Sequence, residues 1–224
     1  MLVVHQMPVK KWVNEMGVPW PYADEFKVGC TVEHAGYVLS WLCAIFGPAE
    51  VVSSFSTTLV SDKVKDDPIE SAHDWSVGCI RFKSGVVLRL TRGIYAPHDH
   101  RLRIFGDDGV IEVRDPRSDD SPVSVRRFIA FRRGRKLAPW SKRLPLLGSK
   151  VRHAKHKGKQ RRDFLRVVAD MAEAVREDRQ PYLSADYCLH VNEIVLALHN
   201  SSDSQCPLRL SSTFERPEPL CWAT

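Results

Sequence analysis

Two consecutive segments with apolar residues at every second position constrain the fold most. The segment WSVGCIRFKSGVVLRLTRGIY (75–95) alternates apolar and polar residues on both sides of Ser84-Gly85, and HRLRIFGDDGVIEVRD (100–115) does so around its DDG turn. Such alternation is typical of strands with one buried face, and short Gly-containing turns join antiparallel neighbours. Two hairpins in series therefore predict a largely antiparallel sheet.

Further strands and three helices complete the pattern, since β-branched residues favour strands and apolar residues at 3.6 spacing favour helices. The expected strands are 49–60, 123–133 and 206–214, and the expected helices are 31–46, 161–178 and 184–202. This order predicts an α+β fold, in which a largely antiparallel open sheet carries helices packed on one face. The other face is then available for dimerisation.

The helix ends and their buried faces follow from the same pattern. Thr31 and Ser184 are the expected N-caps, because a hydroxyl can accept an N–H of the first turn. Gly47-Pro48 ends the first helix. The expected core stripes are Val32, Ala35, Leu39, Leu42 and Phe46 in the first helix, Phe164, Val167, Val168, Met171 and Val175 in the second, and Cys188, Val191, Val195 and Leu198 in the third.

The distribution of charge and the positions of Pro and Gly divide the chain into segments. Thirteen of the 33 Lys and Arg residues lie between Arg132 and Arg162, where no Asp or Glu occurs. Pro and Gly interrupt this stretch, so a long mobile loop is expected at 134–160. The expected organisation is an irregular N-terminal segment at 1–28, a single α+β domain at 29–214 that contains the basic loop, and a tail at 215–224.

Composition excludes several classes of protein. No apolar run approaches the roughly 20 residues that span a bilayer, and the N-terminus lacks the features of a signal peptide, so a cytoplasmic location without a membrane partner is expected. The six cysteines form no CxxC pair and are expected to be reduced and structural. His98 and His100 form an HxH pair without a third ligand at suitable spacing, so no metal site is predicted.

The helix at 31–46 begins with an acid, an imidazole and a phenol among small residues. Glu33 and Tyr37 are four residues apart and therefore share one side, whereas His34 is turned by about 100 degrees from Glu33. Each of the three has a structural alternative: Glu33 can stabilise the helix dipole, His34 can be a hydrogen-bonded structural histidine, and Tyr37 can pack at the helix edge.

The stretch VGCTVEHAGY (28–37) resembles the start of a helix in the C-terminal domain of the Gfo/Idh/MocA family of NAD(P)-dependent sugar and inositol oxidoreductases. GPAEVVSSFS, LRIFGDDGVIEV and the two C-terminal helices extend the resemblance over most of residues 18–214. In the family this helix faces the nicotinamide. Glu33 stands where the family usually has an aspartate, and Tyr37 stands where it usually has a histidine.

The resemblance makes Glu33 and Tyr37 catalytic candidates, and His34, Trp20 and Tyr22 substrate-binding candidates. Full-length relatives bind NAD or NADP through an N-terminal Rossmann domain. No two of the twelve glycines here are separated by a single residue, so the sequence contains no GxGxxG fingerprint, and it contains no Glu-Lys-Pro motif. No cofactor is therefore expected to bind this chain alone, and it is expected to be inactive alone.

The expected function is that of a substrate-binding and oligomerisation domain for a sugar, cyclitol or nucleotide sugar. The expected partners are further copies through the sheet face, a separate Rossmann-domain chain, and the small molecule itself. A non-catalytic module for dimerisation or ligand sensing is the alternative. The segment KVRHAKHKGKQRR (150–162) could meet phosphates, but no aromatic platform accompanies it, so nucleic-acid binding is disfavoured.

Overall fold

The computed structural model describes residues 22–61, 70–94, 99–116, 121–144 and 165–218. Contacts divide the chain into two compact units, where the sequence analysis expected a single domain at 29–214. The first unit combines the N-terminal part of the chain, up to Pro97, with the part from Asp163 to Glu218, and the second is built from His98–Arg162. Both contain antiparallel sheets and the first contains the helices, which confirms the α+β fold class.

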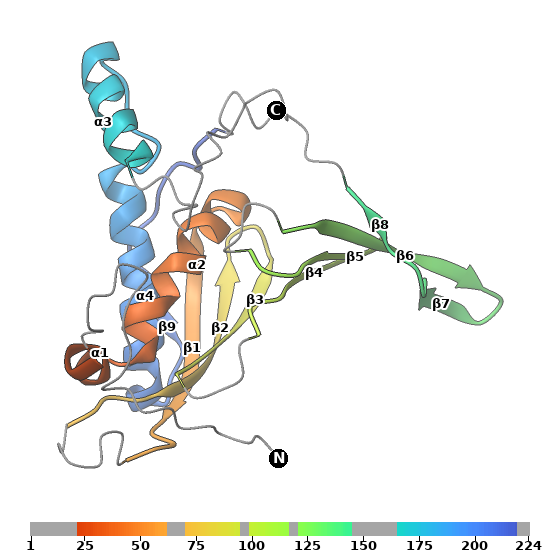
Figure 1. Ribbon diagram of the computed structural model, residues 1–224, viewed down its shortest axis with the longest axis horizontal. Helices are drawn as coiled ribbons and strands as arrows, with labels where there is room; N and C mark the ends of the chain where they lie inside the picture. Colours follow the sequence, from red (N-terminus) through yellow and green to blue (C-terminus); the bar gives the residue numbers. More distant parts are fainter. Residues whose placement is uncertain (1–21, 62–69, 95–98, 117–120, 145–164, 219–224) are drawn as a thin grey trace. The chain divides into compact units, whose positions relative to one another are not determined.

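The first unit is a four-stranded antiparallel sheet with helices on one face. Its strand order is β3-β2-β1-β9, and each neighbouring pair is antiparallel. Figure 1 shows α2 and α4 running along β1 and β2. The elements are α1 (Tyr22–Val28), α2 (Cys30–Phe46), β1 (Ala49–Thr57), β2 (Trp75–Phe82), β3 (Val87–Gly93), α3 (Arg166–Glu177), α4 (Ala185–Ser204) and β9 (Leu208–Arg209).

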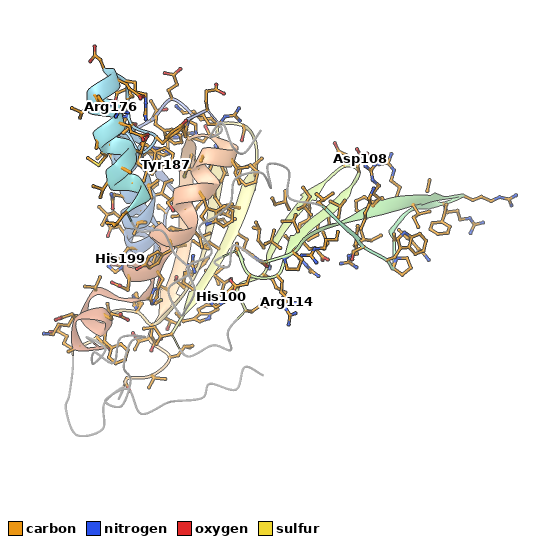
Figure 2. The ribbon with its side chains drawn as sticks, turned by 45° about the horizontal axis from the view of Figure 1, so that its top comes forward. His100, Asp108, Arg114, Arg176, Tyr187 and His199 are labelled. Atoms are coloured by element: carbon orange, nitrogen blue, oxygen red, sulfur yellow. The ribbon has the colours of Figure 1, made fainter. Side chains whose placement is uncertain are left out.

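The hydrophobic core of this unit lies between α2, α4 and the sheet. Leu39 of α2, Val52 and Ile80 of the sheet, and Ile194 of α4 are fully buried in one cluster. Tyr187, labelled in Figure 2, belongs to the same cluster, and its hydroxyl donates a hydrogen bond to the Ser40 carbonyl of α2. The two helices are therefore joined by a polar contact as well as by apolar packing.

The hydrogen-bonded C-terminal segment closes the sheet beside α4. The buried His190 accepts a hydrogen bond from the Ala49 N–H at Nε2 (2.9 Å), and its Nδ1 lies 2.8 Å from the Ser212 hydroxyl. The Glu193 carboxylate accepts bonds from the N–H and hydroxyl groups of Ser211 and Ser212. Burial lowers the pKa of His190, while burial raises the pKa of Glu193 but its hydrogen bonds outweigh this and bring it to about 2. The neutral imidazole and the carboxylate hold this segment in place, which is a structural role.

The second unit is a five-stranded antiparallel sheet with β6 at its centre. One edge of β6 pairs with β5, which in turn pairs with β4, and the other edge pairs first with β7 and then with β8. The strands are β4 (Leu102–Gly106), β5 (Gly109–Val113), β6 (Val123–Phe131), β7 (Gly134–Leu137) and β8 (Lys142–Arg143). The basic stretch expected as a loop at 134–160 thus contributes two strands, and its remainder from 145 lies outside the described residues.

Helix ends agree with the sequence patterns in part. Ser184 caps α4 as predicted, accepting the Tyr187 N–H at 3.2 Å, and Gly47 ends α2. The N-cap predicted at Thr31 is wrong, because α2 begins one residue earlier, with Gly29 in the cap position and the Thr31 hydroxyl bonded to Ser76 instead. Residues Tyr22–Val28, within the segment expected to be irregular, form α1.

The buried helix faces also differ from the expected stripes. In α2 the expected Ala35, Leu39 and Leu42 are buried. In α4 the expected Val191, Val195 and Leu198 are buried, and Tyr187 and Ile194 widen the buried face, while the expected Cys188 is exposed. In α3 the expected stripe is exposed over the described residues, since no other described element covers that side of the helix; these residues are Val167, Val168, Met171 and Val175.

Candidate functional site

The first two turns of α2 carry the polar residues that the sequence singled out. Ala35 and Leu39 face the core, which leaves Glu33 and His34 half-buried and Tyr37 65% exposed. The His34 and Tyr37 rings lie nearly parallel, with their centroids 6.4 Å apart. The structure thus brings the imidazole beside the phenol, while the helical spacing keeps Glu33 one turn from Tyr37 on the same side. The three groups form an acceptor, an aromatic surface and a hydroxyl open to solvent.

A glycine fixes where this helix begins. Gly29 lies between α1 and α2 with φ 88°, in the region that favours glycine. A Cβ atom there would lie 2.9 Å from the Ala72 Cβ and 3.1 Å from the His73 carbonyl oxygen. The Cys30 N–H donates to that same carbonyl at 3.2 Å. The segment at Ala72-His73 therefore holds the start of α2 at close range.

Buried polar groups form hydrogen bonds that hold the start of α2 and the loop after β1 in place. The hydroxyl groups of Thr31 and Ser76 are 2.7 Å apart, which joins α2 to β2. Asp74, 1% exposed, accepts the Leu59 N–H at 2.7 Å and the Val60 N–H at 3.0 Å. These contacts fix the loop after β1 next to the helix, and they leave Glu33 and Tyr37 on a rigid support.

The cysteine in this support is not a nucleophile. Burial raises the pKa of the Cys30 thiol to about 11, so that the thiolate is scarcely present at neutral pH. Cys43, on the buried side of the same helix, has its pKa raised by burial to about 12. Both agree with the expectation of reduced, structural cysteines.

The other predicted residues are not part of this cluster. Trp20 lies outside the described residues, and Tyr22 is the first residue of α1. His98 also lies outside them, and His100 belongs to the second unit, where its Nδ1 is 4.0 Å from Asp115. Within the described part of the chain, no group of His, Cys, Asp and Glu could hold a metal ion.

Sequence reasoning missed the support of the site. Ser76 lies 45 positions after Thr31, and no local pattern connects it or Asp74 with the helix. The one available signal is the acid that directly precedes the first hairpin strand, since a buried acid at a strand end is suited to accepting loop N–H groups.

The described residues do not fit a dinucleotide cofactor. Pyrophosphate sites of this kind use a glycine-rich turn between a parallel strand and a helix, whose first N–H groups face the phosphates. Here α2 follows a helix, not a strand, and its first N–H is already donated to the His73 carbonyl. The strand pairs of the described sheets are antiparallel. The start of α2 therefore offers no cradle for a pyrophosphate.

Comparison with known proteins points to one family. Residues 6–112 match the family model described as the GFO/IDH/MocA C-terminal domain. Over these residues the chain is similar to that domain. The matched region includes α2 with its polar trio and the strands from β1 to β4, so the likeness to Gfo/Idh/MocA proteins rests on the elements that build the site.

Solved oxidoreductase structures share the fold of this chain. An oxidoreductase domain protein from Kribbella flavida superposes with a TM-score of 0.56 at 18% identity, covering 80% of this chain and 49% of that one. Aldose-aldose oxidoreductase from Caulobacter crescentus, complexed with glycerol, gives 0.52 at 16%, covering 78% and 45%. The WlbA dehydrogenase from Bordetella pertussis, in complex with NADH and UDP-GlcNAcA, gives 0.54 at 16%, covering 82% and 46%. The chain thus spans about half the length of these structures.

Two further findings are negative. The comparison with curated proteins found no match. Over the described residues, no helix combines the length and the apolar character needed to cross a bilayer.

Proposed function

We propose that this chain is the substrate-binding and oligomerisation domain of a Gfo/Idh/MocA-type NAD(P)-dependent oxidoreductase that acts on a sugar, cyclitol or nucleotide sugar. The observation that carries the proposal is the group of half-buried Glu33 and His34 with exposed Tyr37, on a helix start that is tied to β2 and to the segment at Ala72-His73. Relatives in complex with glycerol and with UDP-GlcNAcA support a hydroxyl-rich ligand.

The chemistry of the three side chains suits such a ligand. A carboxylate accepts hydrogen bonds from two neighbouring hydroxyl groups, and a phenol both donates and accepts. The aromatic surface made by His34 and Tyr37 adds an apolar area of the kind that binding sites place beside a few polar groups. In this role the trio orients the ligand, and hydride transfer depends on a nicotinamide held by another domain or chain.

A ligand-sensing or dimerisation module without catalysis is the second candidate. The misfit between the start of α2 and a pyrophosphate is compatible with both candidates, because the first assigns the cofactor to another domain or chain and the second needs none. The two candidates differ in one measurement. Reduction of NAD⁺ with matching oxidation of a sugar hydroxyl, in the presence of a Rossmann-domain chain of the same family, supports the oxidoreductase, and ligand binding without turnover supports the sensor.

The Glu33→Gln variant is expected to bind hydroxyl-rich ligands about tenfold more weakly, because it loses a charge-assisted hydrogen bond. Tyr37→Phe should weaken binding about fivefold through loss of a neutral one. Isothermal titration calorimetry with D-glucose, myo-inositol and UDP-N-acetylglucosamine measures both changes.

Asp186→Asn is the matched control for Glu33→Gln. Asp186 is an exposed acid in the first turn of α4, so both variants lose the same interaction with a helix dipole. The control should bind as the wild type does. Equal affinities for wild type and Glu33→Gln, with equal losses of thermal stability in both variants, would reduce Glu33 to a helix-dipole residue.

Oligomerisation is proposed through the uncovered face of the first sheet. Phe55 is 76% exposed and is paired with Val77 across the β1–β2 ladder, and Val87 is 66% exposed on β3. Exposed apolar side chains on a sheet face, here beside Arg81 and Arg89, are a common feature of an interface between subunits.

Phe55→Asp is expected to convert a dimer into a monomer at micromolar concentration, because it places a charge in the centre of this face. Sedimentation velocity measures the change. Phe105→Asp is the control, since Phe105 is 70% exposed on β4 of the other unit and should leave the dimer intact. A wild-type chain that sediments as a monomer would exclude the proposed interface.

A further inference from the structure

The sheet of the second unit has one face that is cationic. Residues directly paired across an antiparallel ladder lie on the same face, and so do alternate residues of one strand. Lys136 pairs with Ile129, and Lys142 pairs with Val125, while Arg127 lies between these two partners on β6. Arg127, Lys136 and Lys142 therefore project from three strands on one face, which is called here the cationic face.

The charges of this face are not neutralised within the described residues. The stretch 121–144 contains eight Lys and Arg residues and no acid. Arg127, Lys136 and Lys142 are exposed, and none of them forms a salt bridge in the part of the chain that the structure describes. The opposite face differs, because there Glu112 lies 2.7 Å from Arg126 and 3.1 Å from Arg103. The opposite face also carries cations, among them Arg135 and Arg143, but Glu112 offsets part of their charge, whereas no acid lies in the strands of the cationic face.

An aromatic ring lies among these cations. Phe131, on the same face as Arg127 and Ile129, is 57% exposed at the end of β6. The Lys136 Nζ is 5.8 Å from the centre of its ring, which confirms that the two side chains share a face. Exposed aromatic rings between cations are the arrangement on which bases stack while phosphates meet Lys and Arg.

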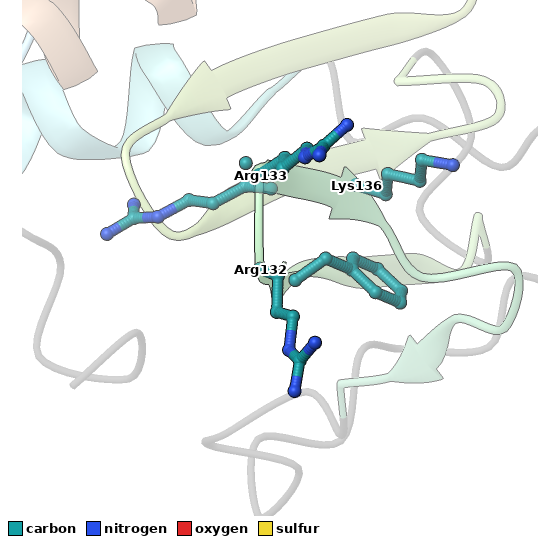
Figure 3. A pocket seen from close by; sticks show the side chains of 6 residues that line it. Arg132, Arg133 and Lys136 are labelled. Atoms are coloured by element: carbon teal, nitrogen blue, oxygen red, sulfur yellow. The ribbon is translucent and has the colours of Figure 1, made fainter.

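The shape of the hairpin favours an extended ligand over a compact one. A concavity of about 480 Å³ at the β6–β7 turn is lined by the consecutive residues 131–136. Figure 3 shows Arg132 and Lys136 pointing away from each other from this turn, and Arg133 also directed outward. Cations that diverge cannot converge on one phosphate, but they can each meet a different phosphate along a chain.

We propose that the cationic face of the second unit binds single-stranded nucleic acid, with the backbone phosphates against Arg127, Lys136 and Lys142 and a base stacked on Phe131. The sequence analysis disfavoured nucleic acid because no aromatic platform was evident. The platform exists only once β7 and β8 pair with β6, in a stretch that was expected to be a loop. A duplex fits less well, because its stacked bases leave Phe131 without a partner.

The test compares two double variants of the full chain with equal loss of charge. Lys136→Gln with Lys142→Gln removes two cations from the cationic face, and Arg135→Gln with Arg143→Gln removes their sequence neighbours from the opposite face. Binding of a fluorescein-labelled single-stranded oligodeoxynucleotide is measured by fluorescence anisotropy over a series of salt concentrations. The first variant should bind roughly tenfold more weakly, with a log–log salt slope smaller by about 1.4, since each phosphate contact on a single strand contributes about 0.7.

The second variant should change the affinity less than twofold. Phe131→Ala should weaken binding about tenfold while leaving the salt slope unchanged, because stacking releases no counterions. Equal losses in the two double variants would overturn the proposal in favour of diffuse attraction. A labelled duplex or heparin that binds as tightly as the single strand, with no effect of Phe131→Ala, would overturn it in favour of a general polyanion surface.

Discussion

Replacing Gly109 by alanine is expected to destabilise the second unit by about 4 kcal/mol, through backbone strain together with overpacking. Gly109 has φ 155°, and a Cβ atom on it would lie 2.1 Å from the Arg126 carbonyl oxygen and 2.9 Å from the Arg127 Cα. These are backbone atoms of the neighbouring strand and cannot move aside without separating β5 from β6. Hydrogen exchange followed by mass spectrometry should show loss of protection at residues 109–113 and 123–127.

Gly106→Ala is the control for this change. Gly106 is paired directly with Gly109 across the β4–β5 ladder, yet a Cβ atom on it meets nothing within 4 Å. Its protection pattern should match that of the wild type. If the two alanine variants behaved alike, the close approach of β5 to β6 would not be a feature of the protein.

Replacing Gly29 by alanine should lower the free energy of unfolding of the first unit by about 3 kcal/mol, because a strained backbone conformation and steric overlap add together. The new methyl group would meet Ala72 and the His73 carbonyl, and it would push the start of α2 away from its support. Urea unfolding monitored by far-UV circular dichroism measures the loss. The same displacement should weaken ligand binding by the residues that follow, Glu33 and Tyr37.

The Gly36→Ala substitution in the same helix is expected to raise stability, whereas Gly29→Ala lowers it. Gly36 lies inside α2 with a helical backbone, and a Cβ atom on it meets nothing within 4 Å. Alanine should therefore stabilise the helix by roughly 0.5–1 kcal/mol. A loss at Gly36 as large as that at Gly29 would show that the helix tolerates no added methyl group, and the special role of Gly29 would be refuted.

The strands could be predicted from sequence because alternation is a local signal. The hairpins at 75–95 and 100–115 appear as β2–β3 and β4–β5, and Gly85 occupies the first turn. The short strands β7 and β8 could not be predicted, because their many cations resemble a loop and their pairing with β6 is a tertiary property.

In the helices, periodicity predicts that an element exists but does not reliably predict which face is buried. Spacing identified the existence of α3, but the stripe that it predicts to be buried is exposed, since periodicity does not reveal whether a second surface is present. Val175, for example, is 86% exposed although it fits the stripe. In α4 the predicted Val191, Val195 and Leu198 are buried, but Cys188 is exposed and its neighbour Tyr187 is buried.

Only the exposed part of the candidate site could be predicted from the sequence. The common side of Glu33 and Tyr37 follows from helical geometry, and the structure adds the contact of His34 with the Tyr37 ring. The support from Gly29, Asp74 and Ser76 depends on contacts between distant segments, which no local pattern encodes.

A titration of the ¹⁵N-labelled chain with myo-inositol, D-glucose and UDP-N-acetylglucosamine, followed by two-dimensional NMR, tests the proposed function most directly. The account predicts saturable shifts concentrated at residues 30–37, at the start of α2, with little change at Asp186 or in the second unit. Saturable shifts confined to other parts of the chain, or no shifts with any of the three ligands, would contradict a substrate site at this helix.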